Sequence, residues 1–353
     1  MKKTLGIFIC SFNNYQLLKN ETLKRNNFKN FPILNIDDHS SKKNIILGRK
    51  ICRENNIKFQ MNRKKGLQYA TNQAIKYFKK NYNCDWIICI QQDNFMIGNS
   101  LLKFQQSIKK NKYKNFGAVG FHHLSEDNLI MNSKIFKEYL AAKKVKGALC
   151  IFSLSDNKTN WLFKIKFTNL LKLFFKSIIR FKIDTNYLKR AISASRVFAP
   201  YTFRNFKRIS KKYNGLFECE LPVWSTIAIN TNVWIKHIKP RKGYIFHLWF
   251  PDIAFQLLRK NIKIGVDSNI YVLNNQKVKE KYGMNYSSAD AGREKNFKHA
   301  EKYGPHLKIF KKYWGFDYEN ILIEFPKVRK KFKGTLIEKF FNHNSREGPF
   351  KQN

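Results

Sequence analysis

The sequence predicts an α/β protein with a mostly parallel central sheet flanked by helices. Short apolar segments alternate with segments of helical spacing over the first 121 residues, and several apolar segments end in polar residues. Strands that alternate with helices of about 10 to 15 residues form βαβ units, whose strands are parallel. The polar ends point to a binding site, because ligands bind beyond the carboxyl ends of such strands.

One strand shows this pattern most clearly. Residues 86–90 are apolar and lead directly into Gln91, Gln92 and Asp93. A short apolar run bounded by polar residues indicates a strand that is covered on both faces. We therefore expect Asp93 at the mouth of a crevice.

The other elements follow in a regular order up to residue 121 and again after residue 220. Strands are predicted at residues 5–11, 33–36, 58–61, 116–121, 148–154 and 224–229, with one or two more at 262–273. Helices are predicted at residues 15–26, 43–55, 66–80, 232–237, 252–260 and from about residue 99. After residue 282 the chain is basic and aromatic without clear periodicity. The expected parts are a first half at 1–121, an insertion at 122–220, a second half at 221–320 and a basic tail at 321–353.

The insertion contains a basic amphipathic segment at residues 161–183. Bulky apolar residues lie on one side of the expected helix, and Lys172, Lys176 and Arg180 recur every fourth residue on another. A helix of this kind can lie in a membrane interface. The alternative is an ordinary helix that packs on the core and keeps its lysines in solvent.

The net charge of +44 predicts attraction to a polyanionic surface, either anionic lipid or nucleic acid. Codon bias in an AT-rich genome would also produce part of this excess.

The six cysteines are scattered without a CxxC pair, which indicates reduced thiols in a cytosolic protein. The sequence contains no uncharged run of about 18 apolar residues, so no membrane-spanning helix is predicted. The apolar start lacks a small-residue cleavage site, so it is interpreted as a strand and not as a signal peptide.

Three polar clusters stand at successive strand ends. They contain Asp37 or Asp38, Asn62 and Asn72, and Asp93. Such a rim can hold a nucleotide, because one carboxylate accepts from a base N–H and another holds a divalent ion that bridges phosphates. Each aspartate alone is also a common turn or cap residue.

These segments resemble those of the GT-A glycosyltransferases, most closely the inverting family 2, over about residues 4–121 and 220–315. The matching segments are Ile7–Asn13, Asp37–Ser41, Asn62–Asn72, Gln91–Asp93 and Pro251–Arg259. The resemblance implies a GT-A (Rossmann-like) fold with a helical basic insertion. It also implies that the first half binds a nucleotide-diphosphate sugar and the second half binds the acceptor.

By this resemblance, Asp93 would hold Mg²⁺ or Mn²⁺ against the diphosphate, and Asp252 would be the general base that deprotonates the acceptor hydroxyl. The donor would be contacted by Ser11, Asn13, Asp37, Asp38, Asn62, Gly66, Asn72, Gln91, Gln92, Asp93 and Arg293. The candidates for acceptor contact are Trp224, His247 and Trp249. For these three residues, packing in the core is the alternative explanation.

The sequence departs from the family pattern at three places. Gln91 replaces the first acid of the Asp-x-Asp motif, so Arg293 or Lys295 would have to help neutralise the diphosphate. The acidic pair that normally precedes the base is reduced to Pro251–Asp252, and no later histidine matches the metal ligand of many relatives.

The expected function is transfer of a sugar to a glycan or lipid-linked acceptor with inversion, in surface polysaccharide or lipopolysaccharide synthesis. The protein is expected in the cytoplasm, bound peripherally to the inner face of the cytoplasmic membrane. One alternative is a nucleotidyltransferase, which usually has a Gly-rich basic loop where residues 11–14 stand. Another is a non-enzymatic nucleic-acid-binding protein, which the charge favours but no motif supports. A third alternative is a degenerate transferase that binds its ligand without catalysis, because Gln91 replaces an acid of the metal motif.

Overall fold

The fold is described from a computed structural model. It describes residues 4–124, 147–148, 150–152, 215–219, 221–245, 248–274, 278, 281–282, 297–318, 325 and 327–341. The amphipathic segment at 161–183 and the candidate site residues His247 and Arg293 lie outside the described residues.

The first half of the chain forms the predicted alternation of strands and helices. Its elements are β1 (Leu5–Ser11), α1 (Tyr15–Leu17), the π-helical turn η1 (Leu18–Thr22), α2 (Leu23–Arg25), β2 (Ile33–Asp37), α3 (Lys42–Glu54), β3 (Lys58–Met61), α4 (Leu67–Tyr82), β4 (Trp86–Gln91), β5 (Asn94–Met96), α5 (Ser100–Lys109) and β6 (Phe116–Leu124). The strands predicted at 5–11 and 58–61 have the same bounds in the structure. The short strand β5 was not predicted, because its three residues are too few to show a period.

The second half adds further strands and a group of helices. Its elements are β7 (Gly147–Ala148), β8 (Cys150–Phe152), β9 (Leu216–Glu218), β10 (Leu221–Pro222), β11 (Thr226–Asn230), α10 (Thr231–His237), α11 (Trp249–Arg259), β12 (Lys263–Asn274), α13 (Phe297–Trp314), the 3-10 helix η3 (Arg329–Phe332) and α15 (Leu336–Phe341). The sequence predicted no regular element after residue 282, whereas the structure forms α13, η3 and α15 there.

The central sheet is mixed, with strand order β3-β2-β1-β4-β11-β6-β12-β5. Strands β3, β2, β1 and β4 pair in parallel with one another, and β6 pairs in parallel with β12. Strand β11 lies between β4 and β6 and is antiparallel to both. The α/β fold with a central sheet flanked by helices is therefore confirmed, and β11 is the main departure from a parallel sheet.

The direction of β11 matters for the site. Because β11 runs opposite to β4, its first residues lie beside the last residues of β4, with Thr226 opposite Ile90. The backbone N–H of Gln91 donates to the carbonyl of Ser225 at 3.1 Å. The sheet therefore brings the carboxyl ends of β1, β2 and β4 and the start of β11 to one edge.

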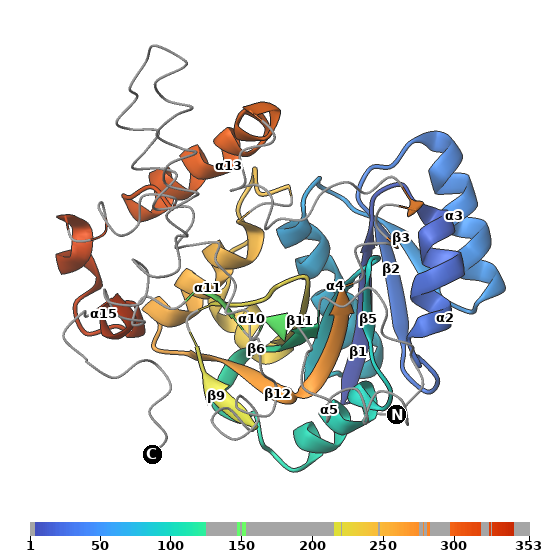
Figure 1. The fold of residues 1–353 in the computed structure, drawn as a ribbon, viewed down its shortest axis with the longest axis horizontal. Helices are drawn as coiled ribbons and strands as arrows, with labels where there is room; N and C mark the ends of the chain where they lie inside the picture. Colours follow the sequence, from blue (N-terminus) through green and yellow to red (C-terminus); the bar gives the residue numbers. More distant parts are fainter. Residues whose placement is uncertain are drawn as a thin grey trace, which may run out of the picture.

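Helices cover both faces of the sheet (Figure 1). In β1, Phe8 packs with α4 and α11, whereas Ile7 and Ile9 pack on the other face with α3 and α5. This alternation follows the period of two of a strand, and all three side chains are fully buried. The two apolar clusters hold the loops at the sheet edge in fixed positions.

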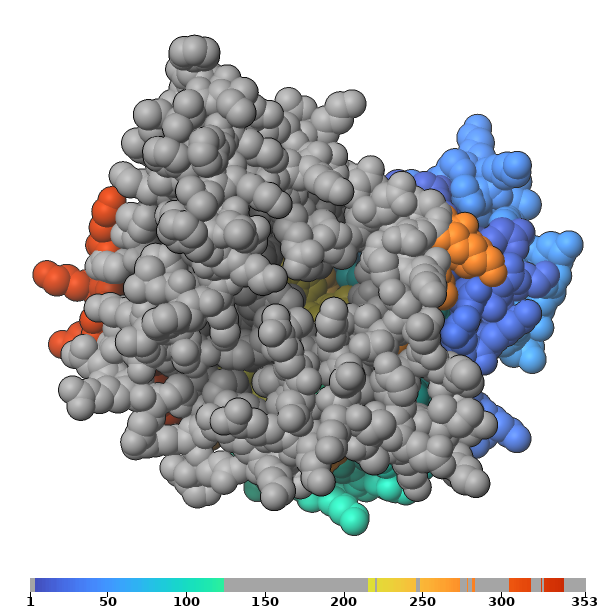
Figure 2. All heavy atoms as spheres, viewed as in Figure 1, coloured from blue at the N-terminus to red at the C-terminus, as the bar shows by residue number. Residues whose placement is uncertain are grey.

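The C-terminal helices pack on α11 through aromatic rings. Phe255 of α11 contacts the rings of Phe310 and Trp314 of α13, with centroids 5.4 and 5.3 Å apart. Phe332 and Ile337 are also buried in this cluster. In Figure 2, the N-terminal residues (blue) and the C-terminal residues (red) lie at opposite ends of the long axis. In the described part of the chain, no helix has the length and apolar character needed to cross a membrane.

Candidate active site

Asn13 joins three of the polar loops at the edge of the sheet. Its backbone N–H donates to Ser40 Oγ at 2.7 Å, and its side-chain oxygen accepts from the backbone N–H of Ser41 at 3.1 Å. Its carbonyl accepts from Gln92 Nε2 at 3.5 Å. Asn13 adopts a left-handed backbone (φ 55°), which asparagine tolerates better than most residues. The loops after β1, β2 and β4 are therefore held together, as the sequence predicted.

Asp38 is held at the centre of the second loop. Its Oδ1 accepts from Asn62 Nδ2 at 2.6 Å and from the backbone N–H of Gly66 at 2.9 Å. Its own N–H donates to the carbonyl of Ser11 at 2.7 Å. Among the described residues, none donates to Asp38 Oδ2, and Asn62 Oδ1 is buried without a partner. Two unused acceptors at a sheet edge suit the N–H and O–H donors of a nucleoside.

Asp37 has a supporting role in the same loop. Its Oδ2 accepts from the hydroxyl of Tyr15 at 2.6 Å, and its Oδ1 accepts from the backbone N–H of Ser40 at 2.9 Å. Burial raises the pKa of Tyr15, and the hydrogen bond to Asp37 raises the pKa further, so the phenol stays protonated and donates. Asp37 therefore fixes the loop that presents Asp38.

Gly66 connects this loop to the second half of the chain. It has φ 122°, and a Cβ atom there would lie 2.7 Å from the carbonyl oxygen of Tyr244. The N–H of Leu67 donates to the carbonyl of Ile245 at 2.9 Å. Only glycine allows this approach, so the first turn of α4 bridges the two halves of the fold.

Gln91 ends β4, and Gln92 and Asp93 form the turn that leads into β5. Thr22 Oγ1 donates to the carbonyl of Gln92 at 2.5 Å, which anchors this turn to the π-helical segment η1. Asp93 is 5% exposed, and its Oδ1 accepts from Asn94 Nδ2 at 2.9 Å. The arrangement places Asp93 beside the Asn13 loops.

A hydrogen-bonded row runs from Asp93 to the neighbouring strands. Asn94 donates to Asp93 and accepts from Ser225 Oγ at 3.1 Å, and Ser225 Oγ lies 3.4 Å from His123 Nδ1. Ser225 and His123 could not be predicted from local sequence patterns, because only the antiparallel pairing of β11 brings them to this edge.

The donor set around Asp93 does not fit a divalent metal by itself. Mg²⁺ and Mn²⁺ favour several oxygen ligands, usually including more than one carboxylate or a phosphate. Within the described ranges, no group of three or more His, Cys, Asp and Glu side chains gathers at one place. Gln91 supplies a neutral amide at the position where the Asp-x-Asp motif has its first carboxylate. The metal at Asp93 stays a prediction.

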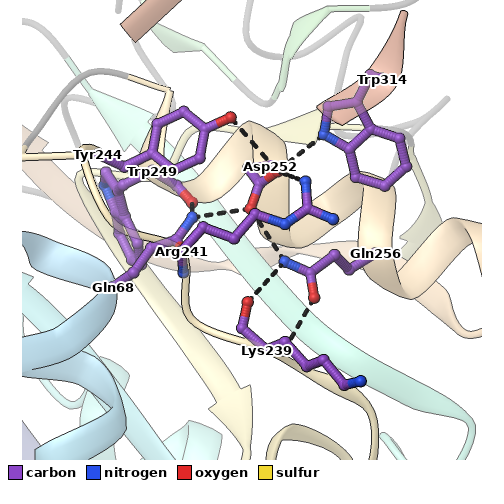
Figure 3. A network of polar contacts seen from close by, with 8 residues as sticks. All are labelled: Gln68, Lys239, Arg241, Tyr244, Trp249, Asp252, Gln256 and Trp314. Atoms are coloured by element: carbon purple, nitrogen blue, oxygen red, sulfur yellow. Dashed lines mark hydrogen bonds and ion pairs between the residues drawn. The ribbon is translucent and has the colours of Figure 1, made fainter. Parts of the chain in front are cut away.

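Asp252 is fully buried at the start of α11 and accepts hydrogen bonds on both oxygens (Figure 3). Among the described residues, the donors to Oδ1 are Arg241 Nη1 at 2.7 Å, Trp314 Nε1 at 2.8 Å and Tyr244 Oη at 3.5 Å. The donors to Oδ2 are Gln68 Nε2 at 3.0 Å and Gln256 Nε2 at 2.9 Å. A carboxylate has about four lone-pair positions, so this one is saturated.

Burial raises the pKa of Asp252, and Arg241 opposes this rise as the nearest positive charge. The hydrogen bonds from Gln68, Trp314 and Gln256 also lower the pKa, without reversing the direction of the shift. A raised pKa brings a carboxylate closer to the pH at which a general base works best.

The partners of Asp252 were not predicted from the sequence. Gln256 follows it by one helical turn, and that spacing would have suggested a contact. Arg241 and Trp314 lie 11 and 62 positions away, so only the fold brings them to Asp252.

Asp38 and Asp252 both accept hydrogen bonds from residues at the start of α4. Asp38 accepts from the backbone of Gly66, and Gln68, two residues later, donates to Asp252. Gln68 also accepts from the backbone N–H of Arg241 at 2.7 Å. The first turn of α4 therefore separates the loop that holds Asp38 from the pocket that holds Asp252.

Three other predicted residues lie outside this cluster of loops. Asn72 Oδ1 accepts from Trp234 Nε1 at 3.1 Å, which places Asn72 at the contact between α4 and α10. Trp224 and Trp249 are 4% and 0% exposed and belong to the apolar core. For these two tryptophans the structure favours the packing explanation, and their contact with an acceptor stays a prediction.

The fold and the site together define an α/β protein with a carboxylate-lined edge that suits a nucleotide. The sequence profile of glycosyl transferase family 2 matches residues 6–186, which is 181 of 353 residues. The chain belongs to this family, and it is a glycosyltransferase. The predicted GT-A, family 2-like class is thereby confirmed.

Solved structures with a similar fold are distant in sequence. The mannosyltransferase PcManGT of Pyrobaculum calidifontis, solved with GDP-mannose and Mn²⁺, is 8% identical, with a TM-score of 0.44, and the match covers 98% of this chain and 71% of that one. Residues 1–349 of TarS from S. aureus are 11% identical, with a TM-score of 0.39 and coverage of 94% and 78%. GalNAc-T7, solved with UDP, GalNAc and Mn²⁺, is 12% identical, with a TM-score of 0.47 and coverage of 97% and 56%. No curated protein sequence matches the chain.

Proposed function

We propose that the protein transfers a sugar from a nucleoside-diphosphate sugar to a hydroxyl of a glycan or lipid-linked acceptor, with inversion at the anomeric carbon. The observation that carries the proposal is the shared position of Asp38 and Asp252 at the first turn of α4. One helix end then separates a donor site, built by the loops after β1, β2 and β4, from an acceptor site beside α11.

Asp38 and Asn62 are the proposed nucleoside contacts. Two donors on Oδ1 fix the Asp38 carboxylate. None of the described residues donates to Oδ2, so this oxygen is available to a ligand. A preorganised acceptor of this kind binds a base N–H or a ribose hydroxyl without first losing an internal hydrogen bond.

Cations of the neighbouring loop support the diphosphate part of the proposal. Lys64 and Lys65 are exposed and lie between Asn62 and Gly66. Lys65 Nζ lies 5.7 Å from the centroid of the Phe12 ring, next to the Asn13 loop. Fixed positive charges stabilise a leaving diphosphate as negative charge develops on it. Arg293, outside the described residues, is a further candidate for this role.

Asp252 is the proposed general base. The acceptor oxygen forms a bond to the anomeric carbon, its proton passes to the Asp252 carboxylate, and the nucleoside diphosphate leaves with the electrons of the broken bond. A general base of this kind contributes about 10² to 10⁴ in rate. Because both carboxylate oxygens are already engaged, the acceptor hydroxyl reaches Asp252 only if one donor moves away.

The net charge of +44 supports a location at an anionic membrane surface and an acceptor of surface polysaccharide or lipopolysaccharide synthesis. Each well-placed Lys or Arg near such a surface contributes about 1 kcal/mol of attraction. The same charge would also attract nucleic acid, so the binding experiment below includes a nucleic-acid arm.

A thermal-shift series tests the donor site. The wild-type protein is heated with UDP, GDP, ADP, CMP or a DNA duplex, each with and without Mn²⁺. We expect one nucleotide at 100 times its Kd to stabilise the fold by about 2.7 kcal/mol, and Asp38→Asn to remove this shift. Asp85→Asn is the matched control, because Asp85 precedes β4 at the opposite edge of the sheet. Stabilisation by DNA alone, or an unchanged shift in Asp38→Asn, would contradict the proposal.

A further inference from the structure

The saturated Asp252 carboxylate raises the question of which donor leaves when an acceptor arrives. We propose that Arg241 is a gate: it holds Asp252 until a phosphate group of the acceptor takes its guanidinium, which opens Oδ1 to the acceptor hydroxyl. This inference rests on the proposed function, and it assigns the acceptor to the phosphate-bearing class. Arg241 is a positioning residue that acts through Asp252.

Four of the five donors to Asp252 are fixed by the core. Gln68 also donates to the carbonyl of Trp249 at 2.9 Å and is fully buried. Gln256 makes two hydrogen bonds to the backbone of Lys239, at 2.9 and 3.2 Å. Trp314 and Tyr244 are 3% and 1% exposed. None of these side chains can leave without breaking further contacts.

Arg241 is the donor that borders solvent. Its side chain is 18% exposed, whereas that of Asp252 is 0% exposed. Its guanidinium carbon lies 3.9 Å from the centroid of the Tyr313 ring and 4.9 Å from that of Trp314. Tyr313 is 45% exposed, so one face of the guanidinium stack opens to the surface. A small rotation of the side chain away from Asp252 would keep this aromatic support.

The loop that carries Arg241 lies along α13. A Cβ atom on Gly243 would lie 2.2 Å from Ile309 Cδ1, and Arg241 stacks on Tyr313, one turn further along the same helix. Arg241 is therefore held between the buried carboxylate and the surface of α13.

The surface around this loop is suited to a phosphate. Exposed lysines stand on the loop at 239 and on α13 at 308, 311 and 312, and no Asp or Glu occurs in residues 239–245 or 305–313. Arginine binds a phosphate with two parallel N–H donors, and the lysines add charge around it. An arginine that leaves a buried carboxylate needs such a replacement anion, because otherwise both charges lose their partner.

The gate predicts opposite effects for the two partners of the ion pair. Asp252 and a phosphate compete for Arg241, so Asp252→Asn should tighten phosphate binding, whereas Arg241→Gln should weaken it. A purely structural ion pair would not produce a gain of binding in Asp252→Asn. The matched control is Lys242→Gln, which removes an exposed charge one residue away, and we expect its effect to be under about 3-fold because exposed charges are screened.

Calorimetric titration with hexose 1-phosphate, inorganic phosphate and methyl hexoside tests the gate without any nucleotide. We expect Asp252→Asn to bind hexose 1-phosphate about 10-fold more tightly than wild type, and Arg241→Gln to bind it about 10-fold more weakly. Methyl hexoside should show no difference between the variants. The double variant Arg241→Gln with Asp252→Asn, which leaves no unpaired charge, checks that the loss is not misfolding.

Three results would overturn the proposal: weaker or absent phosphate binding in Asp252→Asn, unchanged binding in Arg241→Gln, or equal losses in Arg241→Gln and Lys242→Gln. Because the titration contains no nucleotide, its failure is distinct from failure of the donor site, which the thermal-shift series reports.

Discussion

At the scale of single residues, Asp252 is a buried charge that the protein neutralises locally. Removing one partner of a buried ion pair costs about 3 to 5 kcal/mol, because the remaining charge is left uncompensated. The sequence resemblance selected Asp252 but gave no information on Arg241, Gln68 or Trp314, which come from three other segments of the chain. Residues that act through contact across the fold are not visible in local sequence patterns.

The proposed base predicts a specific change in the pH dependence of sugar transfer. Burial raises the pKa of Asp252 and Arg241 lowers it, so Arg241→Gln should raise the pKa further. Transfer requires the ionised carboxylate, so the acid limb of the kcat/KM profile, which reports the free enzyme in which Arg241 still contacts Asp252, should move to higher pH in this variant. Lys242→Gln should leave the limb in place. An acid limb at the same pH in wild type and Arg241→Gln would argue against Asp252 as the base.

His122 predicts a loss of stability in acid. Burial lowers the pKa of His122 to about 4, from 6.5 in its absence. Between these values the unfolded chain binds a proton that the folded protein excludes, so stability should fall as the pH drops from 6.5 to 4. The contribution is about 3 kcal/mol.

The measurement for His122 is the free energy of unfolding by urea at pH 7 and at pH 4.5. His122→Phe keeps a ring beside Tyr271, whose centroid lies 5.5 Å from the imidazole, and removes the titration. The drop in stability between the two pH values should be smaller in the variant. An equal drop would show that other groups cause it.

At the scale of elements, the first turn of α4 organises the site. It receives Asp38 through the N–H of Gly66, contacts the second half through Leu67, and reaches Asp252 through Gln68. The sequence predicted this helix and the polar loop before it, because both have strong local signals. It did not predict that the loop at residues 244–245 packs against the helix end.

Alanine substitutions at Gly66 and Gly215 test how much the close approach of Gly66 to the Tyr244 carbonyl contributes to stability. Gly66→Ala should destabilise the protein by more than the backbone cost of about 1 to 3 kcal/mol for a residue other than glycine at this positive φ, because its Cβ would meet the Tyr244 carbonyl at 2.7 Å. Gly215→Ala is the control, since Gly215 has φ 97° and nothing within 4 Å of the added atom. Urea unfolding should show the larger loss for Gly66→Ala, which should also lose its nucleotide thermal shift. Similar losses in both variants would show that the contact with Tyr244 is unimportant.

The C-terminal helices show where element prediction fails. Helix α13 contains Pro305 and several lysines, so its apolar residues do not form a clear stripe in the sequence. Its stability comes from contacts with rings far away in the chain, such as Phe255 and Phe332. Local periodicity predicts elements that pack with their sequence neighbours better than elements that depend on distant partners.

At the scale of the whole molecule, the charge predicts salt-dependent binding to anionic membranes. The protein should sediment with vesicles of phosphatidylglycerol and phosphatidylcholine and stay in solution with vesicles of phosphatidylcholine alone. Binding should weaken as NaCl rises from 50 to 300 mM (roughly a fall in Debye length from above 10 Å to below 8 Å), because exposed charges are screened. Equal binding to both kinds of vesicle would exclude electrostatic attraction as the cause.

The whole-molecule topology was predictable in its first half and less so in its second. The βαβ order fixed the parallel strands and placed Asp38 and Asp93 at one edge, and the structure joins their loops through Asn13. The antiparallel strand β11 follows the insertion at residues 122–220, whose sequence lacks the regular alternation of the first half, so the direction of β11 could not be predicted. The fold therefore supplied Ser225 at the donor edge, which sequence analysis could not.

The loops after β1, β2 and β4 are proposed to form the nucleotide-sugar site. A crystal structure with the nucleoside diphosphate that gives the largest thermal shift would show whether they do. We expect a base or ribose donor within hydrogen-bonding distance of Asp38 Oδ2 and the diphosphate on the side of Asp93. A nucleotide bound elsewhere on the molecule, with no contact to Asp38 Oδ2, would show that these loops are not the donor site.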